Sequence, residues 1–170
     1  MGLDSGLAGG FENAFVTWNE DSDDSHDVVL QNVTFTLKKN ELTVIAGRVG
    51  SGKTSLLLSL AGELGVTRGQ AWSRARENDS AVAIVEQEPW IQSGTIRDNI
   101  LFGRTYEKET YARTIRACCL ETDFEQLHNH DLTLVGEGGV TLSGGQRSRL
   151  ALARATYQPP RLKTIRQKAK

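Results

Sequence analysis

Gly47-Arg-Val-Gly-Ser-Gly-Lys-Thr54 fits the pattern G-x-x-x-x-G-K-[ST], a loop that binds the phosphates of a nucleotide. Its glycines allow the backbone to wrap around a triphosphate with the N–H groups pointing inward. The ammonium of Lys53 is suited to the β- and γ-phosphates, and the hydroxyl of Thr54 is suited to ligating Mg²⁺. The sequence therefore predicts a nucleotide site with a magnesium ion.

The residues on either side of this loop support the same prediction. Residues 42–46 are a short apolar run with the character of a strand, and residues 54–64 have the pattern of a helix. A strand, a glycine-rich loop and a helix N-terminus in this order form a phosphate site. The apolar residues at helical spacing are Leu57, Leu60, Ala61 and Leu64. The residues expected to contact the nucleotide are Gly47, Arg48, Val49, Gly50, Ser51, Gly52, Lys53, Thr54 and Ser55.

Length and composition indicate an ordinary globular domain. A chain of 170 residues is long enough for one domain with a real core. No apolar run approaches the roughly 18 residues that a membrane span needs, and the N-terminus shows no secretory signal. Cys118 and Cys119 are adjacent and form no disulfide framework, which favours a reducing compartment. We expect a soluble, intracellular chain with no membrane segment of its own.

Two segments near the N-terminus have the character of strands. Residues 15–18 are largely apolar, and residues 33–37 alternate between apolar and polar side chains, as a half-buried strand does. We expect these strands to form an antiparallel β layer against an α/β nucleotide-binding core. We expect the glycine-rich residues 1–12 to be disordered and the residues after Gly65 to form a polar connection.

Beyond residue 80 the pattern changes from strand to helix. Residues 81–85 are a continuous apolar run that suits a strand buried on both faces. Residues 91–134 are largely helical, with Thr95 and Asp98 as an N-terminal capping pair. One apolar stripe is formed by residues that recur every four positions, Tyr111, Ile115 and Cys119.

A second motif, Leu142-Ser-Gly-Gly-Gln146, precedes a helical run at residues 147–157 and is more specific than the phosphate loop. The two motifs in this order resemble the nucleotide-binding domain of an ATP-binding cassette (ABC) transporter. Residues 87–92, 94–103 and 136–146 resemble the C-type, multidrug-resistance-associated branch of that family. The resemblance runs from about Asn13 to Tyr157.

The resemblance implies an α/β fold of the P-loop NTPase class, in which ATP binding and hydrolysis are coupled to transport across a membrane. The implied parts are a β layer with the phosphate-loop core at 13–90, a helical subdomain at 91–141 and a signature helix at 142–157. ATP and Mg²⁺ are the implied cofactors. Under this interpretation, residues 158–170, which are rich in Lys and Arg, form a basic tail after a partial nucleotide-binding domain.

Several residues match positions with known roles in the family. Trp18 matches the aromatic residue that stacks on adenine, although an aromatic residue in the core of a strand has the same flat apolar ring. Gln87 matches the glutamine that helps to hold Mg²⁺, and its loop contacts the transmembrane domains. In the family the second motif closes over the ATP of a partner cassette in a head-to-tail dimer, and the residues that match it are Ser143, Gly144, Gly145 and Gln146.

The resemblance ends after Tyr157. The family continues with a strand that ends in a magnesium-binding Asp, followed by a catalytic Glu and a switch His. In this sequence no Asp or Glu follows Glu137 and no His follows His130. We therefore expect the chain alone to bind ATP with Mg²⁺ but not to hydrolyse it, because phosphoryl transfer needs a complete metal clamp and an oriented water. We also expect a truncated core sheet in which the strand at residues 44–45 has an uncovered edge.

Two other functions fit parts of the sequence. A non-catalytic interaction protein would use the Ser143 end and the Gln87 loop to dock on intact cassettes. DNA-repair and chromosome-maintenance ATPases share the motifs but place a long coiled coil between them, whereas here 54 residues separate Gln87 from Leu142. We therefore predict no nucleic-acid partner, and we interpret His128 and His130 as a loop pair. If it assembles with transmembrane domains, the chain is expected at the cytoplasmic face of a membrane.

Overall fold

The computed structural model describes residues 6–18, 28–73 and 82–157. These residues form two compact units. The first unit contains the described residues up to Val82, and the second contains those from Ala83 onward. Each unit has its own hydrophobic core.

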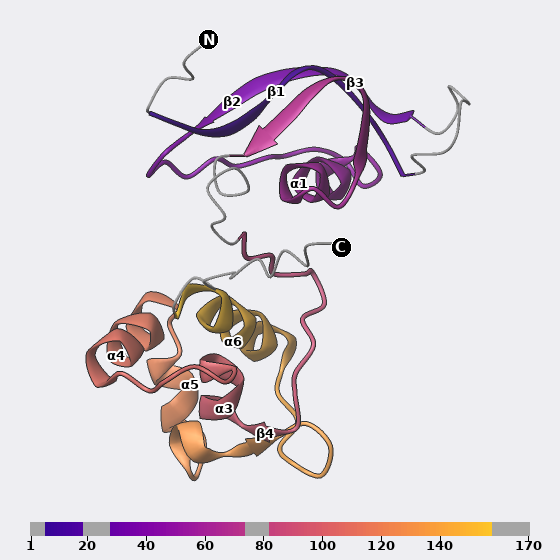
Figure 1. Cartoon of the computed structure of the whole chain (residues 1–170). Coiled ribbons are helices and arrows are strands. Elements are labelled where there is room, and N and C mark those ends of the chain that lie inside the picture. The colour runs from indigo at the N-terminus through magenta and orange to yellow at the C-terminus, as the bar shows by residue number, and fades with distance from the viewer. Residues whose placement is uncertain (1–5, 19–27, 74–81, 158–170) are drawn as a thin grey trace, which may run out of the picture. The chain divides into compact units, whose positions relative to one another are not determined.

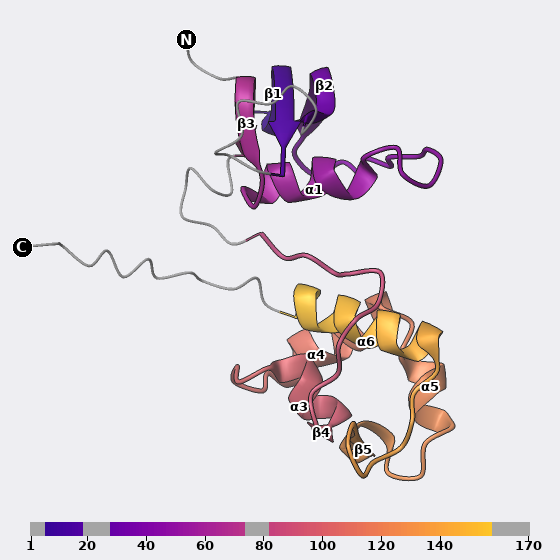
Figure 2. The same cartoon turned by 90° about the vertical axis from the view of Figure 1, so that its right-hand side faces the viewer.

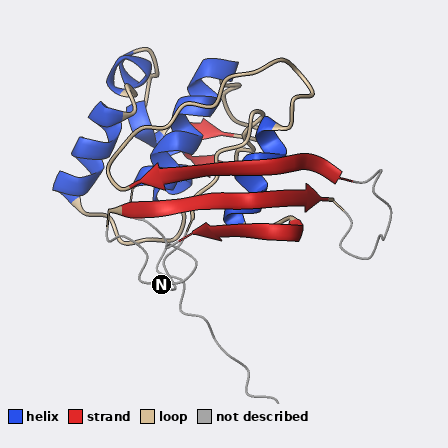
Figure 3. Cartoon of the chain, turned by 90° about the horizontal axis from the view of Figure 1, so that it is seen from above, coloured by secondary structure: helices blue, strands red, loops and turns tan. Residues whose placement is uncertain are grey.

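The first unit is a three-stranded antiparallel sheet with a helix packed against it (Figure 1). The strands are β1 (Leu7–Thr17), β2 (Val28–Lys38) and β3 (Gly65–Ser73), in the order β2-β1-β3. Figure 3 shows them side by side. The helix is α1 (Lys53–Ala61), which lies along one face of the sheet in Figure 2. The buried side chains between helix and sheet are Phe11, Ala14, Val16, Leu56 and Leu64.

The antiparallel β layer predicted from the sequence is confirmed. In β2 the side chains of Val33, Phe35 and Leu37 are partly buried, while Thr34 and Thr36 are exposed. This alternation arises because successive side chains of a strand point to opposite faces of the sheet. The ring of Phe35 lies 5.2 Å from the ring of Phe11 in β1, centroid to centroid, and joins the two strands on the core face.

The expected disorder of residues 1–12 is corrected for residues 7–12, which belong to β1. Glycine is uncommon within strands, but here it allows two backbones to approach closely. A Cβ atom at Gly10 would lie 2.6 Å from the carbonyl oxygen of Phe35, and one at Gly9 would lie 2.9 Å from that of Trp72. Residues 7–12 are therefore ordered by pairing with β2 and β3, although their composition alone suggested disorder.

The expected polar connection after Gly65 is also corrected, because residues 65–73 form β3. Its segment Thr67-Arg-Gly-Gln70 is exposed and pairs with β1 along one edge. Because these four residues are exposed, the segment carries no alternating apolar pattern from which a strand could be predicted.

The strands predicted at residues 42–46 and 81–85 are absent from the part of the chain that the structure describes. Residues 41–48 and 82–86 have no strand pairing, and residue 81 lies outside the described ranges. Leu42 is 92% exposed and Val44 is 76% exposed. A strand needs hydrogen-bonded neighbours, and the described residues supply none to these segments. Ile45 is partly buried against the core of the first unit, whereas residues 82–86 are exposed.

The apolar pattern predicted for α1 is confirmed only in part. Leu64, beyond the end of the helix, is buried and Leu60 packs against the core, but Leu57 is exposed. The buried residues within the helix are Ser55, Leu56 and Ser59. Four of the five residues from Leu56 to Leu60 are leucine, so the apolar pattern does not single out one face of the helix.

The second unit is helical, as predicted for residues 91–134. Its helices are α3 (Ile96–Leu101), α4 (Lys108–Ala117), α5 (Glu121–Glu125), the 3-10 turn η2 (His130–Leu132) and α6 (Gly144–Thr156). A short antiparallel pair joins β4 (Gly94–Thr95) to β5 (Leu134–Val135). The core side chains that pack around α6 include Ile96, Ile100, Tyr111, Ile115, Leu150 and Tyr157.

The predicted apolar stripe of α4 is confirmed at two of its three positions. Tyr111 and Ile115 are buried, but Cys119 is exposed and Cys118 is buried in its place. The helix ends at Ala117, and Cys119 has a left-handed backbone with φ of 54°. Helical spacing therefore no longer applies at residue 119.

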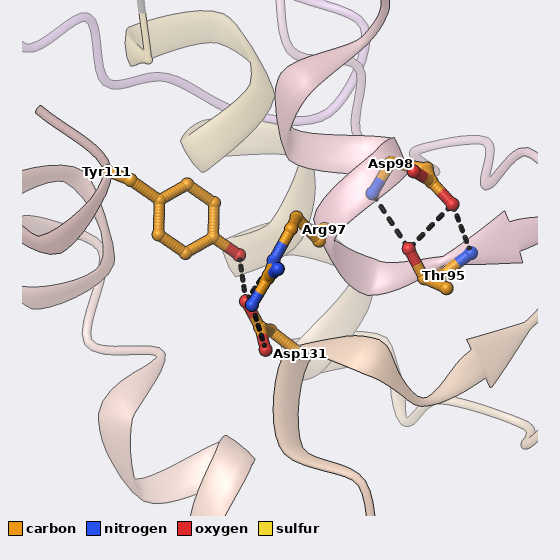
Figure 4. Close-up of polar contacts among 5 residues, drawn as sticks. All are labelled: Thr95, Arg97, Asp98, Tyr111 and Asp131. Atoms are coloured by element: carbon orange, nitrogen blue, oxygen red, sulfur yellow. Dashed lines mark hydrogen bonds and ion pairs between the residues drawn. The ribbon is translucent and has the colours of Figure 1, made fainter. Parts of the chain in front are cut away.

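One ion pair joins three elements of the second unit (Figure 4). Arg97 of α3 donates two hydrogen bonds to the carboxylate of Asp131 in η2, at 2.8 and 3.1 Å. The hydroxyl of Tyr111 in α4 donates to the same carboxylate at 2.9 Å. The hydrogen bond from Arg97 to Asp131 raises the pKa of Arg97, and burial raises the pKa of Tyr111. The arrangement holds the three elements in a fixed position.

The predicted capping pair at the start of α3 is present, and it makes the stability of this unit depend on pH. The carboxylate of Asp98 accepts hydrogen bonds from the hydroxyl and the backbone N–H of Thr95, at 2.6 and 3.0 Å (Figure 4). These bonds, the one from the hydroxyl first, lower the pKa of Asp98. A lowered folded-state pKa means that the stabilisation is present above the unfolded pKa of about 4 and is lost as the pH falls below it.

We expect Asp98→Asn to remove part of this acid sensitivity. Thermal unfolding at about pH 7 and about pH 3 should show a smaller loss of stability on acidification in Asp98→Asn than in the wild type. The control is Glu109→Gln, which removes an exposed carboxylate from α4. Equal acid sensitivity in Asp98→Asn and the wild type would contradict the prediction.

Candidate functional site

The phosphate loop lies between β2 and α1 in the first unit. Gly52 occupies the N-cap position of α1 with a left-handed backbone (φ 86°, ψ 11°). It has no side chain that could accept a hydrogen bond from the first N–H groups of the helix. The first N–H groups of a helix carry a partial positive charge and lack partners within the helix. An uncapped helix start of this kind attracts anions, and phosphate is a common one.

Lys53 folds back over the loop that precedes it. Its ammonium donates hydrogen bonds to the carbonyl oxygens of Gly47, at 3.0 Å, and Arg48, at 2.8 Å. Both partners are neutral, so the full positive charge of the ammonium remains uncompensated within this contact. The loop therefore presents a cation beside the uncapped start of α1.

Two glycines of the loop differ in what a side chain would meet. A Cβ atom at Gly47 would lie 2.6 Å from the hydroxyl oxygen of Ser51, so the Ser51 side chain would have to turn away. Gly50 has φ of 81°, a conformation that other residues rarely adopt, and its missing side chain would face open space. Val49, beside it, is fully exposed. The tip of the loop is thus accessible to a ligand.

The other predicted residues near the loop differ in exposure. Thr54 is exposed at the first turn of α1, so its hydroxyl is accessible to a metal ion, whereas Ser55 is buried. Trp18 follows the last residue of β1 and is 57% exposed, so it is not a core aromatic residue. Its ring is available for stacking on a flat ligand.

Gln87 and the second motif belong to the second unit, whereas the phosphate loop belongs to the first. Gln87 is exposed in an extended segment that runs from Ala83 toward Trp90. The predicted residues of the second motif are brought together at the start of α6, where Ser143 is the N-cap and Leu142 is buried beneath it.

Ser143 and Gln146 form a reciprocal capping box. The Ser143 hydroxyl oxygen accepts a hydrogen bond from the Gln146 N–H at 3.3 Å, and the Ser143 N–H donates to the Gln146 side-chain oxygen at 2.9 Å. A Cβ atom at Gly144 would meet nothing within 4 Å, so no contact within the described chain requires glycine there. The N-terminus of α6 is therefore pre-formed and open to close approach from outside.

Loss of this cap should weaken α6 measurably. We expect Ser143→Ala to lower the free energy of unfolding of the second unit by about 1 kcal/mol, the usual cost of losing a Ser cap. The matched control is Ser148→Ala on the same helix, whose hydroxyl donates only to the Gly144 carbonyl oxygen at 3.1 Å. Native-state hydrogen exchange at the amides of α6 measures both variants, and an equal effect of the two would contradict the assignment of Ser143 as the cap.

Sequence reasoning missed two residues that hold the segment after Gln87. Asn99 of α3 and Arg154 of α6 bind the backbone of residues 90–92. A signal was present, because Asn is disfavoured within helices and Arg154 interrupts the apolar run Leu150-Ala-Leu-Ala153. Their partners are distant in sequence, so the pattern alone did not identify them.

The described residues contain neither a membrane-spanning helix nor a cluster of metal-binding side chains. Among them, no helix is long and apolar enough to cross a membrane. In the same parts of the chain, no group of three or more His, Cys, Asp or Glu side chains could hold a metal ion. His130 instead places its Nδ1 atom 2.9 Å from the carbonyl oxygen of Phe124.

Comparison with known proteins finds one matching family and many relatives. Residues 30–164 match the family described as "ABC transporter". The human protein "ATP-binding cassette sub-family C member 4" is 47% identical over 134 residues, which cover 79% of this chain and 10% of that protein. "Metal resistance protein YCF1" of Saccharomyces cerevisiae is 49% identical over 132 residues, covering 78% of this chain and 8% of that protein.

A plant relative extends the match further along the chain. "ABC transporter C family member 9" of Arabidopsis thaliana is 44% identical over 147 residues, which cover 86% of this chain and 9% of that protein. The chain thus spans only 8 to 10% of the length of these three curated relatives.

Proposed function

The chain belongs to the ABC transporter family, as a nucleotide-binding domain of its C branch, and we propose that it binds ATP with Mg²⁺ through residues 47–55. Domains of this family bind ATP, and Mg²⁺ is the usual partner ion. The observation that carries the proposal is the uncompensated ammonium of Lys53 beside the N-terminus of α1, where no side chain caps the first N–H groups. Both features favour a polyphosphate.

Individual residues have distinct proposed roles in this site. Backbone N–H groups of the loop and the Lys53 ammonium hold the phosphates, and exposed Trp18 stacks on the adenine ring. Thr54 and Gln87, both exposed, are the proposed magnesium ligands. Hydroxyl and amide oxygens are hard ligands of the kind that Mg²⁺ prefers.

We further propose that the chain acts beside a second cassette and the transmembrane domains of a transporter. The pre-formed N-terminus of α6, with open space at Gly144, supports a role in closing over the nucleotide of a partner cassette, head to tail. The exposed Gln87 segment is the proposed contact with transmembrane domains. Such an assembly would place the chain at the cytoplasmic face of a membrane.

These 170 residues by themselves are proposed to bind ATP without turning it over. The sequence has no Asp or Glu after Glu137, and therefore no carboxylate after α6 to complete the magnesium site or to orient a water. Phosphate release from the purified chain measures this directly. Robust turnover that Lys53→Ala abolishes would overturn the proposed inactivity.

Titration calorimetry with ATP and Mg²⁺ tests the proposed binding. Saturable binding of one ATP per chain, weakened by removal of Mg²⁺, is the expected result. Circular dichroism establishes that the sample is folded. A folded chain that binds no adenine nucleotide, with or without Mg²⁺, contradicts the proposal.

A further inference from the structure

The segment that follows Gln87 has its backbone held by side chains instead of by a strand. The carbonyl oxygen of Trp90 accepts a hydrogen bond from Arg154 at 3.2 Å. The N–H of Gln92 donates to the side-chain oxygen of Asn99 at 2.9 Å, and the carbonyl oxygen of Gln92 accepts from the Asn99 amide at 2.8 Å. Backbone groups near a core need partners, and here two side chains supply them.

Arg154 is the centre of this arrangement. Besides Trp90, its guanidinium donates to the backbone oxygen of Asn99 at 2.9 Å and to the side-chain oxygen of Asn99 at 2.6 Å. Its central carbon lies 4.1 Å from the centre of the Trp90 ring and 5.4 Å from that of Phe102. A planar, delocalised cation is suited to donating at its edge and stacking on its faces at the same time.

The partners of Arg154 are neutral. Burial lowers the pKa of its guanidinium, and the described partners include carbonyl oxygens and aromatic faces but no carboxylate. Only Asn99, which is 1% exposed, binds both Arg154 and the segment at Gln92. Removing the guanidinium therefore takes the donor from the carbonyl oxygens of Trp90 and Asn99 and the cation from the rings of Trp90 and Phe102. The side-chain oxygen of Asn99 still accepts from the Gln92 N–H.

Arg154 lies on the same helix as the second motif. Helix α6 runs from Gly144 to Thr156, and Ser143 and Arg154 are separated by about 16 Å along the axis at the usual rise of an α-helix. Between them, Arg149 donates two hydrogen bonds to Asp123 of α5 at 2.7 and 2.8 Å. One helix, fixed midway, thus carries the Ser143 N-terminus and the Arg154 contact.

We infer that Arg154 is a positioning residue that fixes the segment after Gln87 to α6, so that a displacement of this segment reaches the N-terminus at Ser143. The inference deepens the proposed function and rests on it for the role of the two sites. The contact itself stands on geometry alone. It requires an arginine, because the ammonium of lysine cannot make the planar stack and the forked hydrogen bonds together.

Hydrogen exchange of the full chain without nucleotide tests the contact. The amide of Gln92, whose N–H donates to Asn99, should exchange about tenfold faster in Arg154→Met than in the wild type, with an intermediate rate in Arg154→Lys. The control is Arg113→Met on α4, an exposed arginine whose replacement should leave this amide unchanged. Wild-type exchange rates in Arg154→Met would overturn the inference. If that variant does not fold, Arg154→Lys, which keeps the stem and the charge, carries the comparison.

A second measurement, with ATP and Mg²⁺ present, separates positioning from simple packing. In the wild type, nucleotide should change exchange both at the Gln92 amide and at the first turn of α6. In Arg154→Lys the change at Gln92 should remain while the change at α6 is lost. A change at α6 that survives in the variant, or that is missing in a wild type that binds ATP, overturns the inference. Absence of ATP binding contradicts the proposed function instead, and the nucleotide-free comparison still decides the contact.

Discussion

Lys53→Ala is expected to abolish most of the stabilisation that ATP and Mg²⁺ give the chain. The ammonium of Lys53, now shared between the carbonyl oxygens of Gly47 and Arg48, is a full positive charge at the start of α1 that can bind phosphate. Hydrogen bonds to charged groups contribute about 1.5–3 kcal/mol, so we expect about 100-fold weaker binding. At a wild-type excess of 100 times the dissociation constant, the gain in stability should fall from about 2.7 to about 0.4 kcal/mol.

Thermal unfolding over a series of ATP concentrations measures this effect. Lys39→Ala is the matched control, because Lys39 is an exposed lysine of the same unit and lies outside the loop. It should respond to ATP as the wild type does. The outcome that would exclude the proposed role of Lys53 is a rise in melting temperature in Lys53→Ala as large as in the wild type. Without nucleotide, Lys53→Ala should unfold close to the wild type, since the ammonium contacts lie at an exposed loop.

Leu150→Ala is expected to be the more damaging of two identical substitutions on α6. Leu150 is 1% exposed in the core of the second unit, whereas Leu152, two positions further along the helix, is 44% exposed. Truncation of a buried leucine removes its burial and leaves a cavity, at a cost of about 2–5 kcal/mol. The same change at Leu152 should alter the free energy of unfolding by about 0.5 kcal/mol or less. Both changes have nearly the same helix propensity, so packing alone separates them.

Native-state hydrogen exchange at the amides of α6 is the appropriate measurement. The chain has two units with separate cores, so one global unfolding curve can mix two transitions. Exchange within α6 reports the second unit directly. Equal losses for Leu150→Ala and Leu152→Ala would mean that this helix does not pack as described.

The sequence predicted best those features that are decided locally. The alternation in β2, the capping pair of Thr95 and Asp98, and the helix that begins after Ser143 each depend on neighbours within a few residues. Helical spacing likewise placed Tyr111 and Ile115 in the core. Interactions between residues a few positions apart can be read from the sequence and are also present in the folded unit, so these predictions agree with the structure.

Predictions that depended on distant partners were less accurate. Gly9 and Gly10 were expected to be disordered but lie in β1, because two other strands pair with them. Residues 42–46 were expected to be a strand but have no paired neighbour among the described residues. The roles of Asn99 and Arg154 depend on contacts with the Trp90 segment, and for Arg154 that segment is 64 residues away. Composition and periodicity can single out an unusual residue, but they do not identify its distant partner.

Because of the open space at Gly144, substitutions at Gly144 and at Leu150 should differ in their effect on the amount of folded protein. A side chain there would touch nothing within 4 Å, so Gly144→Ala should leave folding and cellular abundance unchanged. A truncated core leucine such as Leu150 would instead expose the protein to quality control and lower its amount. Alleles at these two positions of one helix would therefore differ in the quantity of protein, and only the core allele would respond to a stabilising compound.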